Sequence, residues 1–482
     1  MRYTSHVWLG CAAIVLIAFI GGCTEHSPVA PRQVGDIDAA RAERGGGGSR
    51  YVLRAKNGIS PALRKAVAAA GGSIEREHDS IGVLAVQGLS RDAVAALAAR
   101  ADVEGLDRDM VVQWIPAGVG NIHGTLAGPS SRSDQSGAAF FPSMQWNMRA
   151  IQANDAWPVT NQGSGTLVCI LDSGIDPGHL DLAGRVDLSK STSFVATEPF
   201  IEDLNLHGTF VSAIVASNGI GVASVAPDAR LCAVKVLDYT GNGNFFDLLS
   251  GIVFATNSGA DVINMSLGAY FSRQEPGAME LIKALQRAID FATRHGVLVV
   301  AAAGNDAIYL NRDPEDFIAV PAELRHVVSV GATAPVGQQN FDQLASYSDF
   351  GSSGVDVFAP GGDFVEGSVQ QDLIISACSR YNLFFDCSNG VTYLLGSGTS
   401  FAAPHVAGEA AVIESDIPRD QRALRLERCI VEAADPVGNQ RKDPVFGHGR
   451  INVLNAAACG HRGPGWEKGY HNGPSSIAAR AR

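Results

Sequence analysis

Three polar side chains in the sequence have the types that nucleophilic acyl-transfer chemistry requires. Asp172 follows a short apolar run, His207 opens a segment that reads His-Gly-Thr, and Ser400 lies in the segment Gly-Thr-Ser-Phe-Ala-Ala-Pro-His. A serine hydroxyl is a weak nucleophile, so a neutral imidazole must accept its proton during attack. A carboxylate can hold that imidazole in the required tautomer and stabilise its cation. These residues could therefore act together if the fold brings them to one place.

Short apolar runs alternate with helix-like segments in the part of the chain that carries these residues. The apolar runs lie at 167–171, 231–234, 262–265 and 297–303, and the helix-like segments at 246–257 and 279–295. Continuous apolar strands separated by helices predict an α/β fold with a parallel sheet covered on both faces. Ligands of such sheets bind beyond the carboxyl ends of the strands, which is where Asp172 lies.

These residues, in the chain order Asp, His, Ser, resemble the subtilisin-like serine endopeptidases, the subtilases of the peptidase S8 type. The segment at 398–408 carries the strongest likeness. Shorter matches are Val-Ala-Pro at 225–227, Lys-Val-Leu at 235–237, Ser-Leu-Gly at 266–268, Ala-Ala-Gly-Asn at 302–305, Phe-Ala-Pro-Gly at 358–361 and Gly-His-Gly-Arg-Ile-Asn at 447–452. The resemblance implies a subtilisin-like parallel-sheet catalytic domain flanked by helices over residues 144–460.

The resemblance also assigns roles to individual residues. It implies that Ser400 attacks the peptide carbonyl, that His207 is the base and later the acid, and that Asp172 orients His207. The side chain of Asn305 and the backbone N–H of Ser400 would form the oxyanion hole. The reaction implied is peptide-bond hydrolysis through an acyl-enzyme.

Substrate-binding residues follow from the same resemblance. An extended peptide would lie as a strand between two protein segments, with main-chain hydrogen bonds that tolerate many sequences. The implied residues are Gly241, Asn242, Gly243, Ser266, Leu267 and Gly268 beside the peptide, and Ala302, Ala303 and Gly304 at the floor of the primary pocket. These small residues predict a roomy apolar pocket without an acidic residue. The alternative for 241–243 is a simple glycine turn.

The sequence departs from the family at several points. Phe210 stands where relatives usually have a histidine, Ala213 replaces a helix glycine, and Phe401 replaces the methionine that commonly follows the nucleophile. The loop at 216–221 is shorter and less acidic than the calcium-binding loop of many relatives. We therefore expect no required cofactor and assign no metal ligands; calcium is compatible with the family but has no assigned site here.

Residues 50–115 predict a separate small domain. Strand-like and helix-like segments follow one another in the order β-α-β-β-α-β, with Ser60 and Ser90 as helix N-caps. This is the ferredoxin-like α+β arrangement, and it resembles the inhibitory pro-segment of subtilases. Its last strand, around 110–114, would lie in the substrate cleft, and the linker at 116–143 would carry the processing site. The alternative is an N-terminal domain that stays attached.

The N-terminus is typical of an export signal. Arg2 precedes an apolar run at 7–22 that is short for a membrane span, and Ile-Gly-Gly before Cys23 resembles a bacterial lipobox. We expect a signal peptide at 1–22, lipidation of Cys23 and a flexible tether at 23–49, so that the chain is membrane-anchored until it is processed and secreted. The alternative is an ordinary secretory signal cut near Ala30. Residues 461–482 would form a C-terminal tail.

Six of the eight cysteines remain after Cys11 in the signal and Cys23. They are Cys169, Cys232, Cys378, Cys387, Cys429 and Cys459. An even number in an oxidising compartment favours disulfides but leaves the pairing open. We predict Cys378–Cys387, which closes a short loop, and next Cys429–Cys459 between the last helical stretches. We expect Cys169 and Cys232 to be free thiols, because neighbouring buried strands give poor geometry for a bond.

Composition excludes several classes of function. The 482 residues are 46% hydrophobic and 18% charged, which is enough apolar material for a large core. A formal charge of −12 does not favour nucleic acid as a partner. Two hypotheses remain: an exported, self-processing serine endopeptidase, expected as a monomer acting on proteins or peptides, or a catalytically silent subtilase scaffold that binds proteins.

Overall fold

A computed structural model of the chain describes residues 49–115, 122–129, 139, 141–310, 317–387, 391–413, 417–438 and 442–460. The predicted signal peptide, Cys23, nearly all of the tether, much of the linker and the C-terminal tail lie outside these residues. Among the residues described, no helix is both long enough and apolar enough to span a bilayer.

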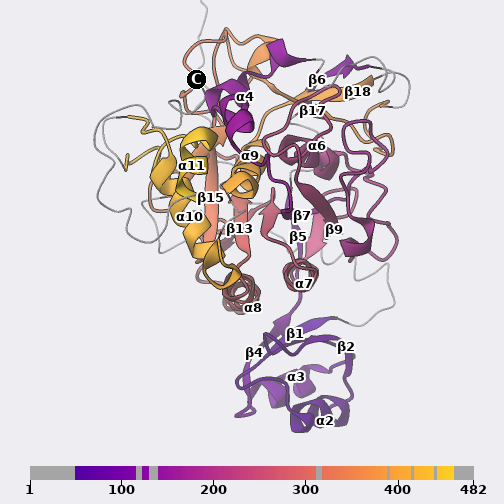
Figure 1. The fold of residues 1–482 in the computed structure, drawn as a ribbon. Helices are drawn as coiled ribbons and strands as arrows, with labels where there is room; N and C mark the ends of the chain where they lie inside the picture. Colours follow the sequence, from indigo (N-terminus) through magenta and orange to yellow (C-terminus); the bar gives the residue numbers. More distant parts are fainter. Residues whose placement is uncertain are drawn as a thin grey trace, which may run out of the picture. The chain divides into compact units, whose positions relative to one another are not determined.

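A seven-stranded parallel sheet forms the centre of the larger domain (Figure 1), in the order β16-β15-β13-β11-β7-β9-β8. The strands are β7 (Leu167–Asp172), β8 (Thr192–Ser193), β9 (Arg230–Lys235), β11 (Val262–Met265), β13 (Leu298–Ala302), β15 (Val327–Thr333) and β16 (Val357–Pro360). Every residue of β7, β11, β13 and β15 is buried. The predicted parallel sheet with both faces covered is therefore confirmed.

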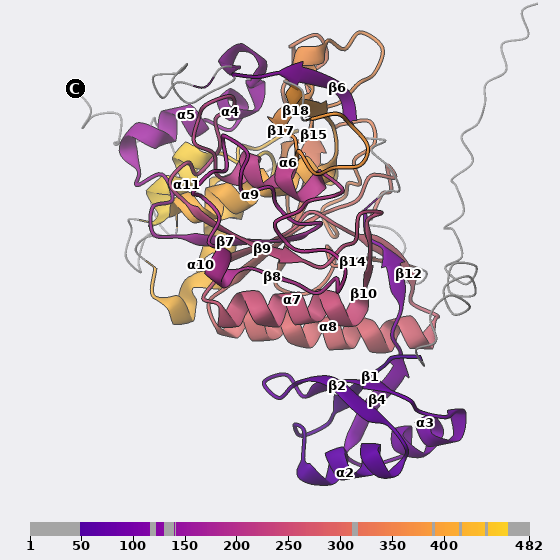
Figure 2. The ribbon, with the colours of Figure 1, turned by 90° about the vertical axis from the view of Figure 1, so that its right-hand side faces the viewer.

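Helices cover the two faces of this sheet in two layers. One layer contains α6 (His207–Val215), α9 (Thr399–Ile413), α10 (Arg422–Ala433) and α11 (Val453–Gly460), and the other contains α7 (Phe245–Asn257) and α8 (Pro276–Arg294). Figure 2 shows α7 and α8 lying side by side. Successive side chains of β13 enter opposite cores: Val300 packs in the core of α9, and Val299 in the core of α7 and α8.

Smaller elements complete the larger domain. These are α4 (Trp146–Ala150) and α5 (Ala153–Ala156) before β7, β10 (Asn242–Asn244), the antiparallel pair β12 (Ala269–Ser272) and β14 (Phe317–Val320), and the antiparallel pair β17 (Ile374–Ala377) and β18 (Val391–Gly396). β18 leads directly into α9, so its end is fixed next to Ser400.

The N-terminal residues form a four-stranded antiparallel sheet in the order β2-β3-β1-β4 with its own core. Its elements are β1 (Tyr51–Ala55), α2 (Pro61–Ala69), β2 (Ser73–His78), β3 (Val83–Gln87), α3 (Arg91–Ala98) and β4 (Val103–Arg108). The hydroxyls of Ser60 and Ser90 accept hydrogen bonds from the N–H groups of Leu63 and Ala93, 3.0 and 3.2 Å away, as N-caps do. The order of elements is the β-α-β-β-α-β order predicted from the sequence.

Two strands differ from the sequence prediction. The extended segment predicted at 103–112 is interrupted after Arg108, and β5 (Val111–Gln113) pairs antiparallel with β10 of the larger domain. The linker predicted at 116–143 contains a strand, β6 (Ile122–Ala127), which pairs antiparallel with β18. Both strands find main-chain partners far away in sequence, which local residue patterns do not reveal.

Candidate active site

Asp172 and His207 face each other where β7 ends and α6 begins. The Nδ1 atom of His207 lies 2.9 and 3.0 Å from the two carboxylate oxygens of Asp172. Asp172 is only 1% exposed. Ser173 links the two elements, because its hydroxyl accepts a hydrogen bond of 3.1 Å from the N–H of Gly208. The imidazole is therefore held with Nδ1 toward the carboxylate, which leaves Nε2 available for another partner.

A second buried carboxylate, that of Asp203, fastens the same region. It accepts hydrogen bonds from the hydroxyl of Ser173 at 2.8 Å and from the N–H and hydroxyl of Thr209 at 2.8 and 2.7 Å. Ser173 follows Asp172, and Thr209 lies two residues after His207, so Asp203 joins both sides of the pair. Asp203 was not predicted from the sequence, where its position four residues before His207 is the only sign of its role.

Opposing effects act on the pKa of His207. Burial lowers it, but the charge and hydrogen bond of Asp172 and the charge of Asp203 outweigh burial and raise the pKa above its ordinary value of 6.5. The imidazolium is thus stabilised once it forms, as a base that accepts a proton during a reaction requires.

Ser400 is the second residue of α9 and is 4% exposed. Its carbonyl oxygen accepts a 2.7 Å hydrogen bond from the hydroxyl of Ser266. The next residue, Phe401, has its ring centre 5.8 Å from that of His207 and 4.1 Å from that of Phe210. The fold therefore gathers Asp172, His207 and Ser400 into one region, although they lie far apart in the sequence.

Asn305 is held in one orientation beside Ser400. Its side-chain oxygen accepts hydrogen bonds from the N–H and the hydroxyl of Thr399, at 2.9 and 2.8 Å. Because the oxygen is fixed by Thr399, the amide NH₂ is the end turned away from these donors. Asn305 and Ser400 line one cavity, so this NH₂ can donate to an oxygen bound there.

That cavity has a volume of about 170 Å³. It is lined by Trp114, Leu267, Gly268, Ala269, Tyr270, Ala302, Ala303, Gly304, Asn305, Asp306, Ala319, Val320, Ala322, Thr399 and Ser400. It contains the predicted floor residues but is not free of acidic groups, because Asp306 lines it. The prediction of a pocket without an acidic residue was wrong. Asp306 directly follows the Ala-Ala-Gly-Asn motif at 302–305, and the chain there places this residue in the cavity lining.

Tyr270 and Asp349 add further oxygen atoms behind this cavity. The hydroxyl of Tyr270 donates a hydrogen bond to the buried carboxylate of Asp349. Burial raises the pKa of Asp349 to about 7. A Cβ at Gly304, whose φ is +127°, would overlap both groups. Only glycine fits there, so the two oxygens approach the pocket wall closely.

The predicted substrate-binding segments lie on both sides of residues 111–115. Gly243 pairs with Val112 in the antiparallel ladder, and the N–H of Gly268 donates a 2.9 Å hydrogen bond to the carbonyl of Trp114. The indole N–H of Trp114 donates to the carbonyl of Gly243 at 3.0 Å, and its ring packs edge-on against Phe245. An extended chain thus occupies the channel between the segments 241–243 and 266–268.

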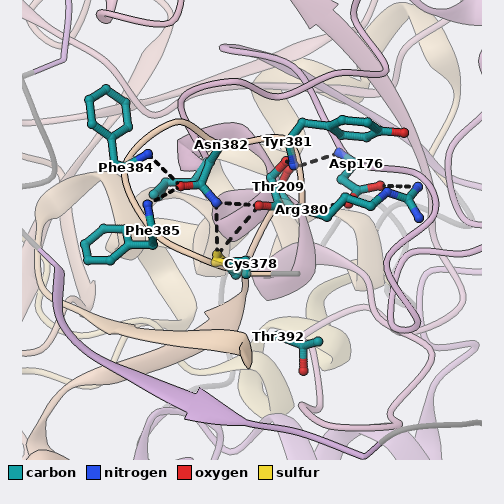
Figure 3. Close-up of a disulfide and its surroundings, with 12 residues drawn as sticks. Asp176, Thr209, Cys378, Arg380, Tyr381, Asn382, Phe384, Phe385 and Thr392 are labelled. Carbon is teal, nitrogen blue, oxygen red and sulfur yellow. Dashed lines mark hydrogen bonds and ion pairs between the residues drawn. A yellow bond between two sulfur atoms is a disulfide. The ribbon is translucent and has the colours of Figure 1, made fainter. Parts of the chain in front are cut away.

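A disulfide-closed loop stands beside the His207 helix. Figure 3 shows Arg380 of this loop reaching Asp176, with its guanidinium 2.9 Å from the carboxylate. The Asn382 oxygen accepts hydrogen bonds from the N–H groups of Phe384 and Phe385, at 3.0 and 2.7 Å. The N–H of Leu383 donates to the carbonyl of Leu204, three residues before His207. The loop therefore braces the segment that carries the imidazole.

Three disulfides are formed by the described cysteines. Two are the predicted pairs, Cys378–Cys387 and Cys429–Cys459. The expectation of free thiols at Cys169 and Cys232 was wrong, because these residues are joined. They lie directly opposite each other in the β7–β9 ladder with their Cα atoms 4.5 Å apart, within the range that a disulfide spans.

The loop at 216–221 does not fit a calcium ion. Both carboxylate oxygens of the buried Asp181 accept hydrogen bonds from backbone N–H groups, those of Ile220, Gly221 and Val222, at 2.7 to 3.2 Å. These groups are donors, whereas calcium requires oxygen ligands. In the described part of the chain, no three acidic, histidine or cysteine side chains are grouped so that they could hold a metal ion.

Phe401 leads to a prediction about oxidation. A methionine at this position would form a bulky, polar sulfoxide beside Ser400, whereas a phenylalanine cannot. Because Phe401 is 1% exposed and packs on Phe210 and His207, the oxidised side chain would disturb all three. We expect peptidase activity to survive mild peroxide in the parent and to fall in Phe401→Met. Equal loss in both proteins would contradict this.

The sequence of this chain is similar to those of known serine proteases. The subtilase family model matches residues 163–449. A thermophilic serine proteinase of Bacillus sp. (strain AK1) is 33% identical over 320 residues, covering 66% of this chain and 68% of that protein. Subtilisin Savinase of Lederbergia lenta is 35% identical over 313 residues, covering 64% of this chain and 97% of that protein.

Solved structures agree in fold. The epidermin leader peptide processing serine protease of Staphylococcus aureus superposes with a TM-score of 0.68 at 22% identity, covering 86% of this chain and 99% of that one. At that identity the likeness shows the fold alone. The family match extends over more than half of the sequence and includes Asp172, His207, Asn305 and Ser400. The chain belongs to the subtilase family of serine endopeptidases.

Proposed function

We propose that Asp172, His207 and Ser400 form the catalytic triad of an endopeptidase that is exported and processes itself. The observation that carries the proposal is His207, which is hydrogen-bonded through Nδ1 to a buried Asp172 and has its ring centre 5.8 Å from that of Phe401, the residue that follows Ser400. His207 takes the hydroxyl proton of Ser400 during attack on the peptide carbonyl. It then gives this proton to the leaving amine, and water hydrolyses the acyl-enzyme in the same way.

The oxyanion of each tetrahedral intermediate needs donors that are already in place. The NH₂ of Asn305 and the N–H of Ser400 are the two candidates, and the hydrogen bonds from Thr399 to the Asn305 oxygen support this role. The start of α9 adds the positive end of a helix dipole. Donors fixed before the reaction stabilise the transition state without reorganisation.

We propose that residues 50–115 are an inhibitory pro-domain. The channel between the segments 241–243 and 266–268, which a substrate would use, holds residues 111–115. Arg50 supports the docking of the rest of this domain, because it pairs with Asp109 and, 3.0 Å away, with Asp247 of α7. Val52 and Val83 pack in one core with Leu281 and Leu285 of α8. Cleavage after β5 would release the domain and open the channel.

Export and lipidation remain part of the same proposal. Subtilisin relatives, an apolar N-terminal run and three disulfides support passage to an oxidising compartment. If Cys23 is acylated, a cut in the linker separates the anchor from the protease domain. Release from the pro-domain and release from the membrane would then be one event.

The competing proposal, a silent scaffold that binds proteins, is less well supported. A binding module has no need of a buried acid on an imidazole beside a serine, nor of an amide fixed by Thr399. The two proposals differ in whether Ser400 is chemically activated. A fluorophosphonate reacts with an activated serine and can be mapped by peptide mass spectrometry.

We expect the mature protein to be labelled at Ser400 and a His207→Ala protein, matured with added parent enzyme, to remain unlabelled. Labelling that is absent from the correctly folded parent, or equal in both proteins, would reject the triad. Melting curves of the two proteins show whether folding is preserved.

The acidic groups at the primary pocket predict a preference for substrates. Asp306 is the charged residue among those that line the cavity, so we expect arginine or lysine before the scissile bond to be favoured over methionine. Asp306 is exposed and screened by water, so Asp306→Asn should lower the arginine-to-methionine ratio of kcat/KM by about threefold to tenfold. The parent's ratio should fall with added NaCl. A ratio that responds to neither change would contradict this.

A further inference from the structure

The strand β6 pairs with β18, the strand that leads to the nucleophile. Figure 1 shows β6 running beside β18, and the ladder pairs Ile122 with Gly396 and Gly124 with Leu395. Only Ser397 and Gly398 separate the end of β18 from α9. The imidazole Nε2 of His123 lies 2.9 Å from the hydroxyl of Ser397. The first residues of β6 therefore sit against the residues that lead directly into Ser400.

The fit of β6 against β18 is close and specific. A Cβ at Gly128 would overlap the ring of Tyr393, and Tyr393 cannot retreat, because it is buried and donates a 2.6 Å hydrogen bond to Asp181. His123 stacks on Phe364, with the ring centres 5.3 Å apart. The segment thus has small residues where it meets β18 and a ring contact at its start. These contacts indicate a binding surface that is specific for this segment.

The positions of β5 and β6 correspond to the two parts of a substrate, before and after the scissile bond. Trp114 lines the same cavity as Ser400, and its carbonyl is bound by Gly268. His123 is bound at Ser397, three residues before the nucleophile. Residues before a scissile bond would thus lie along β10 and Gly268, and residues after it along the outer edge of β18. In this chain β5 covers the first surface, and β6 covers the second.

A cut between β5 and β6 has different consequences for the two strands. β5 belongs to the N-terminal domain and can leave with it. β6 stays covalently joined to the protease domain, so its effective concentration at β18 remains high after the cut. After the cut, dilution lets β5 dissociate from the protease domain, whereas β6 remains attached to it.

We propose that β6 is a second self-inhibitory strand, retained after processing, on a surface that binds extended polypeptide following the scissile bond. The inference rests on the proposed protease function. A substrate that extends beyond the scissile bond must displace β6 before it pairs with β18. A substrate that ends at the scissile bond does not compete with it.

The test compares two substrates on processed enzyme whose active sites have been titrated with a fluorophosphonate. One is a peptide anilide, and the other is an internally quenched peptide with the same residues before the scissile bond and four more after it. His123→Ala and Gly128→Val loosen β6. Thr125→Ala, at the next exposed position on the same face of β6 as His123, is the matched control.

We expect the loosened variants to raise kcat/KM for the long substrate by roughly fivefold to tenfold, since one net hydrogen bond changes an equilibrium by about that factor. The gain should come through KM, and kcat/KM for the anilide should stay within about twofold. A synthetic peptide of residues 122–127 should inhibit the variants with the long substrate only.

Equal changes for both substrates would overturn the proposal. So would an unchanged long-substrate rate in a variant whose β6 amides have lost protection from hydrogen exchange. Failure of the underlying protease function would appear differently, as a parent that is neither labelled nor active on the anilide.

Discussion

Ser400→Ala is expected to lower the turnover of a peptide anilide by about 10⁶, the order known for removal of the triad serine in subtilisin itself. In the proposed mechanism the Oγ atom of Ser400 forms the acyl-enzyme, so without it only Asn305 and the substrate-binding segments would contribute. The variant should fold normally, because the Ser400 carbonyl that holds the Ser266 hydroxyl is unchanged. Initial rates with protein matured by added parent enzyme, which is then removed, measure the effect.

A second serine provides the control. Ser329 is buried in β15, and its hydroxyl has no hydrogen-bond partner among the residues that the structure describes. Ser329→Ala therefore makes the same chemical change as Ser400→Ala, away from the site. We expect this variant to retain activity within about twofold. Similar losses in the two variants would mean that Ser400 contributes only to folding.

Asp172→Asn is expected to lower kcat by about 10⁴, because an amide no longer selects the tautomer that presents a free Nε2 to Ser400. The pH profile should change as well. The charge and hydrogen bond of Asp172 raise the pKa of His207, so their removal lets burial lower this pKa. The base must be neutral to act, so the acid limb of kcat/KM should move to lower pH in the variant.

The pH profile separates this role from a structural one. A variant that is merely destabilised would lose activity without moving its acid limb, since the environment of the imidazole would be unchanged in molecules that remain folded. A shift of the limb to higher pH would contradict the assigned role of Asp172. Differential scanning fluorimetry at each pH monitors folding.

The sequence predicts the parallel sheet for a physical reason. Fully buried parallel strands require continuous apolar runs, so β7, β11 and β13 are visible as such runs at 167–171, 262–265 and 297–303. A polar residue at the carboxyl end of β7 must then lie at the functional edge of the sheet, which identifies Asp172. The segment around Ser400 has a distinctive order of residues.

Features that depend on pairing between distant segments could not be predicted in the same way. The Cys169–Cys232 bond follows from the register of two strands that are 63 residues apart. The placement of β6 on β18 joins segments more than 260 residues apart, and neither strand has an apolar run that indicates its partner. Residue patterns report which positions are buried, but not which strand edges meet.

The acidic groups at the primary pocket also depend on contacts between segments that are distant in the sequence. Tyr270 and Asp349 come together across 79 residues, and Gly304 lets both approach the cavity wall. In the sequence, Asp349 stands in a loop-like polar stretch with no sign that it becomes buried. The small residues at the floor of the cavity could be predicted from the sequence, whereas the tyrosine and the carboxylate behind them could not.

The mass and N-terminal sequence of the purified chain test the central claim most directly. The parent and Ser400→Ala are expressed in the same host, and each product is measured intact. We predict that the parent has lost roughly its first hundred residues and begins within 116–143, since a pro-domain of typical size is removed with its tether. Ser400→Ala should persist with its N-terminal domain attached. Identical processing of both proteins would contradict the claim, because another protease would then make the cut.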